Sequence, residues 1–352
     1  MGKIISIGKA FPPYLWKQGL AKEFVDNRFQ DHIPNREKAL QVYDNGRIEQ
    51  RYLAVPFERE LQERSFDEKN RQFEEYFINM GKESILKCLA DVNVHPEEID
   101  HIVFVTSSGV IHQGILSLLC QEIQCRVNVR CTLLFGLGCA GGAGGLARAN
   151  DLLANHPRGK VVLCCIESFS INFIVDESSS AHLVYLSLFG DGGAAALLVG
   201  DELADEFVGP SIIASESVLI PNSKDLVHIG VKDGGFTGGV SQKLPLLLDK
   251  HLEGNVKRFT EGQGVTSEQI SSYIVHAGGK KILEIAAKSL HIDHEDLKHS
   301  WEVLRTSGNT ASVLVLLILD ELIREQSPSH GDLSLMLAVG PGITLEQILL
   351  QW

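Results

Sequence analysis

From residue 101 onward, short apolar runs rich in β-branched residues alternate with stretches of helical spacing, which predicts an α/β fold. The run from His101 to Thr106 has no internal polar residue, so it predicts a strand buried on both faces. The first hundred residues differ, because a short strand at 4–7 is followed by a polar, helix-rich region. Further predictions for the first half are strands at 129–135, 160–167 and 194–199, and helices at 114–123 and 140–154.

The second half of the chain repeats the plan of the first. Thr106 ends a predicted strand and Cys139 follows 33 positions later, while His276 ends another strand and Asn309 also follows 33 positions later. Each half then closes with a Gly-x-Gly turn and a strand, so we expect paired sheets with helices between and outside them. The second half predicts strands at 273–276, 333–339 and 343–350, helices at 280–289 and 310–326, and a polar loop before Asn309.

The two halves, which we place at residues 1–205 and 206–352, are joined without a linker rich in Pro, Gly or Ser, so we expect one compact body. The formal net charge of -13 disfavours nucleic acid as a partner, because phosphate binding needs a basic surface. The best candidate for a membrane helix, 311–319, is far shorter than the ~20 apolar residues of a span. We therefore predict a protein without a membrane span.

The seven cysteines are odd in number and contain no CxxC pair, and several lie in apolar runs. This pattern predicts reduced, buried thiols in a cytoplasmic protein and no metal site, rather than a disulfide framework.

Cys139 is the strongest candidate for chemistry. It lies in Phe-Gly-Leu-Gly-Cys-Ala-Gly-Gly, directly before a predicted helix. A helix N-terminus favours negative charge, so a thiolate there is stabilised, and the glycines let a substrate approach the backbone closely. A buried structural cysteine is the competing interpretation, since free cysteines are commonly buried.

His276 and Asn309 are the candidate partners. His276 ends a strand, where sites of α/β folds collect, and Asn309 is the counterpart of Cys139 in the repeat, although Asn is also an ordinary helix cap. A thiolate can accept an acyl group from a thioester, and an imidazole and an amide can stabilise an enolate oxygen. The set therefore suits carbon–carbon bond formation on thioesters, while a protease-type Cys/His/Asn set uses the same residue types.

At these positions the chain resembles the type III polyketide synthases, the chalcone-synthase-like branch of the thiolase superfamily, of the bacterial type. The resemblance covers essentially the whole chain. The motifs that carry it are Arg47-Ile-Glu-Gln-Arg-Tyr52, Gly138-Cys-Ala-Gly-Gly142, Leu188-Phe-Gly-Asp-Gly192, His276-Ala-Gly-Gly-Lys-Lys-Ile-Leu283, Ser307-Gly-Asn309 and Val339-Gly-Pro-Gly-Ile-Thr344.

The resemblance implies a five-layered αβαβα thiolase-like fold and a homodimer. It implies that Cys139 carries the starter and the growing chain, while His276 and Asn309 support thioester attack and malonyl decarboxylation. Acyl-CoA and malonyl-CoA would be used directly as substrates, with no cofactor, no metal and no carrier protein. Phe189 would be an aromatic gatekeeper, and Gly340, Pro341 and Gly342 would shape the cavity wall.

The chain also departs from the family pattern. Gly238 stands where the family has a second gatekeeper phenylalanine, with Phe236 as a possible substitute. His112 replaces a methionine that reaches across the dimer. The resemblance assigns coenzyme A binding to Lys38, and it places Gln41 and Asn45 where the family has two further basic residues, for which Arg47 could compensate.

These departures favour a bacterial-type enzyme that takes a medium or long fatty acyl starter and makes an alkylpyrone or alkylresorcinol. Two alternatives stay open at this point. One is a ketoacyl-ACP synthase III-like enzyme that extends once and uses acyl carrier protein. The other is an inactive thiolase-fold partner subunit.

Overall fold

The computed structural model describes residues 1–29, 36–56, 64–172, 185–241, 243–325 and 328–352, without the side chains of 28, 29, 36–39 and 228. Nine of its strands form one hydrogen-bonded sheet in the order β11-β12-β13-β8-β1-β7-β6-β4-β5. Their bounds are β1 (Gly2–Ala10), β4 (His101–Thr106), β5 (Arg130–Phe135), β6 (Lys160–Glu167), β7 (Gly192–Gly200), β8 (Ser211–Leu219), β11 (Ile270–Val275), β12 (Leu333–Gly340) and β13 (Thr344–Gln351).

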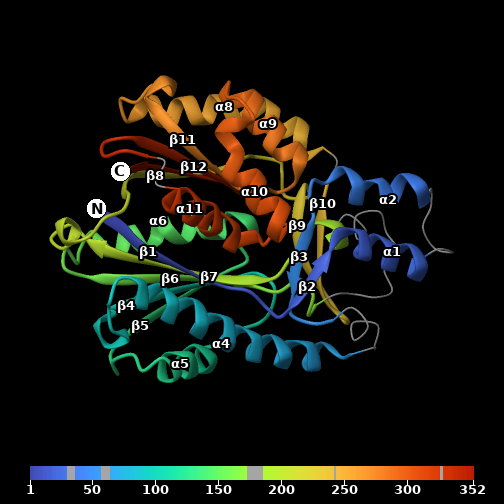
Figure 1. Ribbon diagram of the computed structural model, residues 1–352, viewed down its shortest axis with the longest axis horizontal. Coiled ribbons are helices and arrows are strands. Elements are labelled where there is room, and N and C mark those ends of the chain that lie inside the picture. Colours follow the sequence, from blue (N-terminus) through green and yellow to red (C-terminus); the bar gives the residue numbers. More distant parts are fainter. Residues whose placement is uncertain (30–35, 57–63, 173–184, 242, 326–327) are drawn as a thin grey trace.

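The sheet divides into two layers at the junction of β1 and β8. That junction pairs Lys3 with Ser211, whereas β1 and β7 are paired along their length. Strands β1, β4, β5, β6 and β7 form one layer, and β8, β11, β12 and β13 form the other (Figure 1). Each layer belongs to one half of the chain, as the internal repeat predicts.

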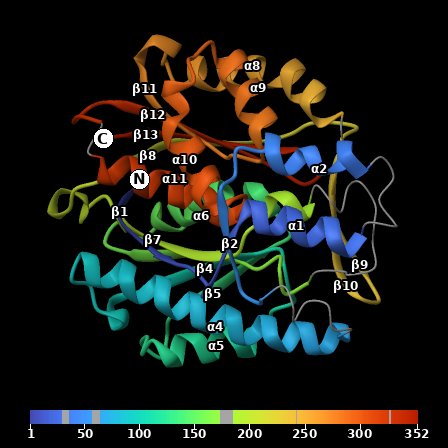
Figure 2. The same cartoon turned by 45° about the vertical axis from the view of Figure 1, so that its right-hand side comes forward.

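Helices lie between the two layers and on both outer faces (Figures 1 and 2). The inner helices α6 (Gly141–Leu153) and α11 (Leu314–Arg324) contact strands of both layers. One outer face is covered by α4 (Phe66–Asp91) and α5 (Gln113–Glu122), and the other by α8 (Leu244–Gly262) and α9 (Lys280–Leu290). The arrangement confirms the predicted five-layered αβαβα, thiolase-like fold.

The remaining elements lie around these layers. They are α1 (Gln18–Phe29), α2 (Arg36–Asn45), α10 (Lys298–Ser307), the pair β2 (Tyr14–Lys17) and β3 (Gln50–Leu53), and the pair β9 (Val227–Lys232) and β10 (Gly235–Val240). Strands β9 and β10 pair with each other and form a two-stranded sheet apart from the large one.

Side-chain alternation along the buried strands divides the core in two. On β6, Leu163 and Cys165 face the central cluster between the layers, while Cys164 and Ile166 face the outer cluster beneath α4 and α5. Successive side chains of a strand point to opposite faces, so a strand that is buried on both faces is apolar at every position. This explains why the apolar runs show no alternation.

One prediction for the second half is wrong. The segment before Asn309 was expected to be a polar loop, but it contains α10. The apolar residues Leu297, Trp301 and Leu304 are spaced four and three positions apart, and all three are buried. This spacing is that of one helix face, and the many polar residues between them concealed it.

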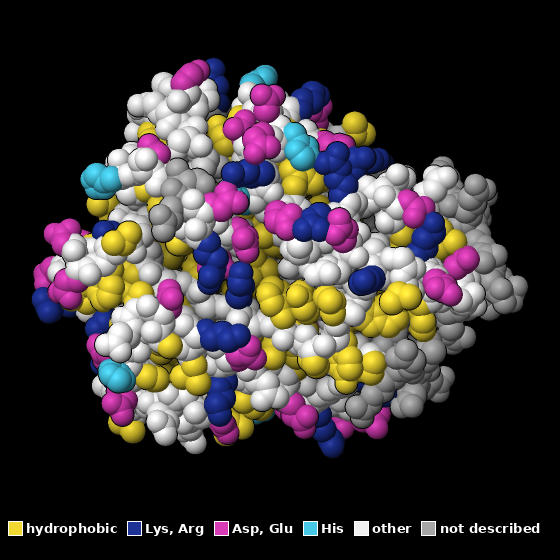
Figure 3. Space-filling view, in the orientation of Figure 1, with side chains coloured by type: hydrophobic (Ala, Val, Ile, Leu, Met, Phe, Trp, Pro, Cys, Tyr) yellow, Lys and Arg dark blue, Asp and Glu magenta, His cyan; other side chains and the backbone are white. Residues whose placement is uncertain are grey.

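Charges of both signs are interspersed on the face in Figure 3, and the described residues form no broad basic surface there. Within the described ranges, no helix has the length and apolar character needed to span a membrane.

Candidate active site

Cys139 lies in a short 3-10 turn, Gly138–Ala140, between β5 and α6. The Gly138 backbone N–H donates to Ser107 Oγ at 2.8 Å, which ties the turn to the end of β4. Gly138 has φ 52, and a Cβ at this position would lie 2.7 Å from the Pro341 ring. A glycine is therefore required before Cys139, both by the left-handed backbone and by the second half of the chain packed against it.

Asn309 reaches the same point from the second half. Its amide nitrogen Nδ2 lies 3.9 Å from Cys139 Sγ, and its oxygen Oδ1 lies 4.0 Å from the sulfur. The Asn309 backbone N–H donates to the Leu188 carbonyl at 2.8 Å, and its own carbonyl accepts from Gly190 N–H at 3.1 Å. Oδ1 also accepts from Ala311 N–H at 2.9 Å, so the amide is held with Nδ2 directed at the Cys139 sulfur.

His276 follows β11 and is buried beside Asn309. Its backbone N–H donates to the Leu337 carbonyl at 2.8 Å, which continues the pairing of β11 with β12. Burial lowers the pKa of His276 to about 4, and a hydrogen bond with Asn309 opposes part of that shift. Its Nε2 is buried and has no hydrogen-bond partner among the described residues. The imidazole is therefore neutral at pH 7, and its Nε2 has no protein partner among the described residues.

The Cys139 thiol is also neutral at rest, which differs from the expectation of a stabilised thiolate. Burial raises the pKa of Cys139 to about 12, while Asn309 acts in the opposite direction and the Glu167 carboxylate adds to the rise. Desolvation of the anion outweighs the favourable helix start. The thiol must therefore lose its proton before it can act as a nucleophile.

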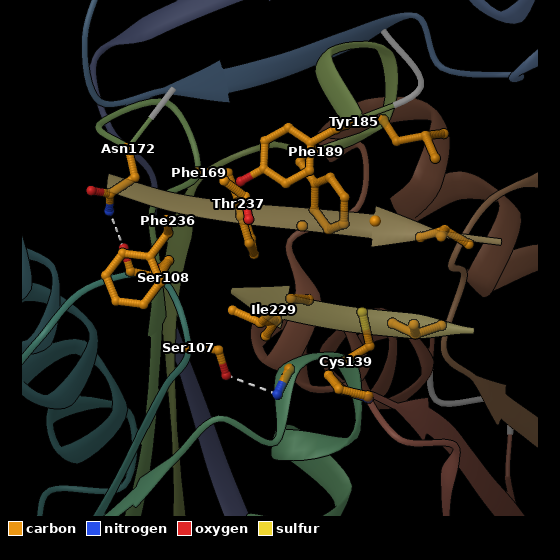
Figure 4. Close-up of a pocket in the computed structure, with 18 residues that line it drawn as sticks. Ser107, Ser108, Cys139, Phe169, Asn172, Tyr185, Phe189, Ile229, Phe236 and Thr237 are labelled. Carbon is orange, nitrogen blue, oxygen red and sulfur yellow. Dashed lines mark hydrogen bonds between the residues drawn. The ribbon is translucent and has the colours of Figure 1, made fainter. Parts of the chain in front are cut away.

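An apolar cavity opens beside Cys139 (Figure 4). Of the predicted wall residues, Phe189, Gly238 and Pro341 line it. Gly340 lies behind the wall, where a Cβ would be 2.5 Å from the Leu137 carbonyl, and Gly342 donates its N–H to the Val227 carbonyl at 3.1 Å. The Gly-Pro-Gly turn thus places one proline in the cavity and packs its two glycines against the backbone.

Phe189 belongs to an aromatic group that sequence reasoning did not identify. Its ring centroid lies 4.4 Å from that of Phe169 and 4.6 Å from that of Tyr185 (Figure 4). All three rings line the cavity. The Phe189 ring is therefore held in the cavity wall by two neighbours from the same half.

Two of the sequence motifs hold this aromatic group in place. The buried Asp191 carboxylate accepts from the backbone N–H groups of Ala54 and Phe169, each at 2.7 Å. Arg51, also buried, donates to the carbonyls of Leu186 at 2.6 Å and Phe189 at 2.8 Å. Both charged groups therefore fix the backbone around Phe189 and do not face the cavity.

Glu167 was also missed, and it connects the two halves beside Cys139. Its carboxylate accepts from Ser107 N–H at 2.9 Å, from Ser108 Oγ at 2.7 Å and from Ser312 Oγ at 2.7 Å. Burial raises the pKa of Glu167 to about 7, although these hydrogen bonds act against the rise. Its position at the end of a predicted strand was the available signal.

Neighbouring side chains fill the cavity wall around Gly238. Ile229 on β9 and Phe236 on β10 both line the cavity (Figure 4). The Phe236 ring packs edge-on against Phe66 at 5.7 Å and Phe135 at 6.4 Å. The cavity volume is about 60 Å³. This volume is small beside the roughly 300–1,000 Å³ of typical ligand pockets.

The coenzyme A residues are not brought together by the described contacts. Lys38 lies on α2, but its side chain is outside the described residues. The Arg47 guanidinium lies 4.6 Å from the centre of the Trp301 ring and contacts His294. His112 caps α5 by accepting from Gly114 N–H at 3.0 Å. The roles of Lys38 and Arg47 in coenzyme A binding stay predictions.

The described residues contain no group of three His, Cys, Asp or Glu side chains that could hold a metal ion. The fold, the contact between Cys139 and the buried Asn309, and the neutral imidazole define a condensing enzyme of the thiolase-like class.

Comparison with known proteins gives the family. Residues 1–202 match "Chalcone and stilbene synthases, N-terminal domain", and residues 211–352 match the corresponding C-terminal domain. A relative from Bacillus subtilis (strain 168) that bears a chalcone synthase name is 31% identical over 366 residues, which cover 100% of this chain and 99% of the relative. The chain belongs to the chalcone and stilbene synthase family, and it is a type III polyketide synthase.

Two further relatives are informative. The acylalkylpyrone synthase csyB of Aspergillus oryzae is 28% identical over 93% of this chain and 89% of its own length, and the structure of CsyB complexed with CoA-SH superposes with TM-score 0.91, 26% identity and full coverage of both chains. The structure of 1,3,6,8-tetrahydroxynaphthalene synthase from Streptomyces coelicolor A3(2) superposes with TM-score 0.94 and 26% identity, covering 99% of each chain.

Proposed function

We propose that the protein loads an acyl group from a coenzyme A thioester onto Cys139, extends it repeatedly with malonyl-CoA, and cyclises the product. The observation that carries this proposal is the contact between Cys139 Sγ and Asn309 Nδ2, 3.9 Å apart at the edge of an apolar cavity. The sulfur can form a covalent thioester, while the amide can donate to an oxygen that becomes negative.

Loading begins from two neutral groups. As Cys139 Sγ attacks the thioester carbonyl, the His276 imidazole accepts the thiol proton and then returns it to the departing coenzyme A thiolate. The pKa of about 4 keeps His276 neutral, so the base is available throughout the physiological pH range. The acyl group is then held on sulfur, inside the cavity.

Extension uses the same two partners for a different purpose. When the carboxylate of malonyl-CoA leaves as carbon dioxide, its bonding electrons move to the thioester oxygen and form an enolate. Asn309 Nδ2 and the free ring nitrogen of His276, when it carries the proton, donate hydrogen bonds to this oxygen. The enolate carbon attacks the acyl carbonyl, a carbon–carbon bond forms, and Cys139 sulfur leaves as a thiolate that then takes up a proton from solvent.

The cavity wall favours an alkyl starter and an alkylpyrone or alkylresorcinol product. Val227, Ile229 and Val240 from β9 and β10 present aliphatic side chains to the chain that grows on Cys139. These two strands are hydrogen-bonded to each other and not to the large sheet, so they can shift together to enlarge the cavity. The relative named acylalkylpyrone synthase supports this product class.

The direct use of coenzyme A thioesters has support from the CoA-SH complex of CsyB, a structure that covers the entire chain. We expect Lys38 and Arg47 to assist this binding and no carrier protein to be required. The family match over both halves favours this activity over the single-step ketoacyl-ACP synthase III-like alternative.

The test is product analysis by mass spectrometry after incubation with malonyl-CoA and a series of acyl-CoA starters, without carrier protein. We expect alkyl-chain pyrones or resorcinols from fatty acyl-CoA starters, and longer starters to be accepted by an Ile229→Ala variant. Turnover of malonyl-CoA alone to an aromatic product, with no use of fatty acyl-CoA, would reject the alkyl assignment. Absence of product without carrier protein would reject the proposed polyketide cycle.

We also propose that the enzyme is a homodimer formed along β5. This strand ends the large sheet, and Phe135 on it is 52% exposed. Nearby segments expose Val110, Leu118 and Val127. An edge strand with exposed apolar neighbours needs a cover, and a second copy can supply an identical edge. Light scattering of the wild type and of Phe135→Asp should give a dimer and a monomer, respectively; a monomeric wild type would contradict this assembly.

The seven cysteines are all free thiols, which fits a reducing compartment such as the cytoplasm.

A further inference from the structure

Arg51 is a buried cation that lies behind the cavity wall. It belongs to β3, its side chain is 2% exposed, and it is not among the described residues that line the Cys139 cavity. Its Nη1 donates to the Leu186 carbonyl at 2.6 Å and to the Phe189 carbonyl at 2.8 Å. Because burial of an ionised group is costly, a guanidinium is an expensive way to fill this space. Its two bonds to backbone carbonyls therefore indicate a specific task.

The segment that Arg51 holds is hydrogen-bonded to the catalytic amide residue of the second half. Phe189 and Asn309 form an isolated parallel β-bridge. The Asn309 backbone N–H donates to the Leu188 carbonyl at 2.8 Å, and the Gly190 N–H donates to the Asn309 carbonyl at 3.1 Å. The peptides on both sides of Phe189 therefore fix the backbone of Asn309, while Arg51 fixes the Phe189 carbonyl between them.

Arg51 also packs directly against the residue before Asn309. Gly308 has φ 67, and a Cβ at this position would lie 2.7 Å from Arg51 Cγ and 2.8 Å from Arg51 Cδ. A Cβ at Gly190, on the other side of the bridge, would lie 3.5 Å from Arg51 Cβ. The aliphatic stem of Arg51 thus occupies the space beside both chains of the bridge, and only glycine fits at position 308.

The Asn309 amide depends on this backbone for its position. Its Nδ2 lies 3.9 Å from Cys139 Sγ, and its Oδ1 accepts from Ala311 N–H two residues further along the chain. An oxyanion donor is effective when it is in place before the charge develops. A displacement of about 1 Å, caused by a change far from the reacting atoms, can lower a rate by roughly 10²-fold.

We propose that Arg51 is a positioning residue for decarboxylation. It holds segment 186–190, and through the β-bridge it holds the Asn309 amide where the enolate oxygen forms. This inference rests on the proposed function, because it takes Asn309 as the donor that stabilises the enolate of malonyl-CoA. Its distinctive consequence is that the effect of Arg51 on the rate passes through the side chain of Asn309.

A double-mutant cycle in the full-length Cys139→Gln protein, supplied with malonyl-CoA, tests this consequence. Arg51→Met keeps an aliphatic stem but has no N–H to donate, so it should lower carbon dioxide release by a factor on the order of 10–10². Asn309→Ala should lower it by on the order of 10²–10³. Adding Arg51→Met to Asn309→Ala should then cost less than about threefold more, because no amide remains to be positioned.

Two further variants sharpen the cycle. Arg51→Lys keeps a cation that can reach one of the two carbonyls, so it should lose less activity than Arg51→Met. Gln18→Leu is the matched control, because Gln18 is also buried and its Nε2 donates to the Ser187 carbonyl at 2.8 Å, within the same segment but outside the bridge. We expect a much smaller loss in Gln18→Leu than in Arg51→Met.

Circular dichroism and thermal melting verify that each variant is folded. Should Arg51→Met not fold, the cycle is measured with Arg51→Lys, whose loss of activity should likewise disappear in the Asn309→Ala background. This keeps a stability defect apart from a positioning defect, since a defect in overall folding lowers the rate whether or not the amide is present.

Three results would overturn the proposal. One is an equal loss from the Arg51 variant with and without the Asn309 amide, which would assign Arg51 to overall structure. The others are an unchanged rate in folded Arg51→Met, and a loss in Gln18→Leu as large as that in Arg51→Met. Absence of carbon dioxide release in the Cys139→Gln parent itself would instead reject the proposed decarboxylation, and this inference with it.

Discussion

The turn that carries Cys139 and the turn that follows Asn309 are built alike, but they hold their functional groups differently. A three-residue 3-10 turn leads into α6 in the first half and into α11 in the second. Cys139 remains partly accessible, whereas Asn309 is buried and three of its polar groups are engaged in hydrogen bonds. A nucleophile must move to form a covalent bond, while an oxyanion donor works best when it is already in position. The repeated plan therefore serves two different chemical requirements.

The largest effect should come from removing the sulfur. Cys139→Ala should lose covalent loading entirely, because no other described thiol lines the cavity. Intact-protein mass spectrometry after incubation with an acyl-CoA measures the loss. Cys165→Ala serves as a control, since this thiol is buried in the core. Acylation of another residue in Cys139→Ala would disprove the assigned nucleophile.

Removing the fixed amide should have the next largest effect. Asn309→Ala should lower kcat for malonyl-CoA consumption by a factor on the order of 10²–10³, as for loss of one oxyanion donor. Asn172→Ala is the matched control, because Asn172 also lines the cavity but donates to the Ser108 carbonyl. Equal losses in both variants would assign the Asn309 effect to cavity packing instead of hydrogen-bond donation.

Replacing the carboxylate that links the two turns should change stability in a pH-dependent way. The pKa of Glu167 is raised by burial to about 7 from an ordinary value of 4.5, so its protonated form stabilises the fold fully below pH 4.5. That contribution falls as the pH rises through 7, because the unfolded state gives up the proton more readily. Glu167→Gln cannot ionise, so it should gain on the order of 3 kcal/mol relative to the wild type above pH 7.

Urea unfolding of the wild type and Glu167→Gln at pH 4.5 and pH 8 measures this difference. A variant that is destabilised equally at both values would show that its hydrogen bonds, and not its proton, determine the effect.

The smallest effect should come from the backbone of the turns. Ala311 has φ 46, a left-handed conformation that costs a residue with a Cβ about 1–2 kcal/mol. Ala311→Gly relieves this strain but loses about 0.4–1 kcal/mol through greater freedom of the unfolded chain, so a net gain of about 1 kcal/mol or less is expected. Ala140, in the other turn, has φ -78 and is the control. Ala140→Gly should destabilise the protein, and thermal melting that ranks the two variants the other way would contradict this assignment of strain.

Much of the architecture could be predicted from the sequence. The strands at His101–Thr106 and Lys160–Glu167 were predicted with their observed bounds, because strands buried on both faces leave a clear apolar run. The equal spacing within the two halves led to Cys139, His276 and Asn309, which the fold brings to one place. Helix α10 escaped detection because many polar residues separate the apolar residues of its buried face.

The residues that shape the cavity were harder to identify. Phe169 and Asn172 lie in turns and Tyr185 begins a short helical stretch, and the positions of all three follow from contacts between segments far apart in the sequence. Gly238 on β10 pairs directly with Ile229 on β9, and Phe236 lies two residues before Gly238. The larger side chains beside Gly238 can therefore be identified only when the pairing of β9 and β10 is known. Glu167 was within reach, since it ends a strand just as His276 follows one, and the same rule could have marked both.

A Cys139→Gln variant supplied with malonyl-CoA tests directly whether the second half of the chain supports decarboxylation without the sulfur of the first half. The glutamine cannot carry an acyl chain, but the imidazole and the amide remain. We predict release of carbon dioxide and formation of acetyl-CoA without any polyketide, and a loss of this release by on the order of 10²–10³ when Asn309→Ala is added. If the release is unchanged in the double variant, the second half does not supply the group that stabilises the enolate.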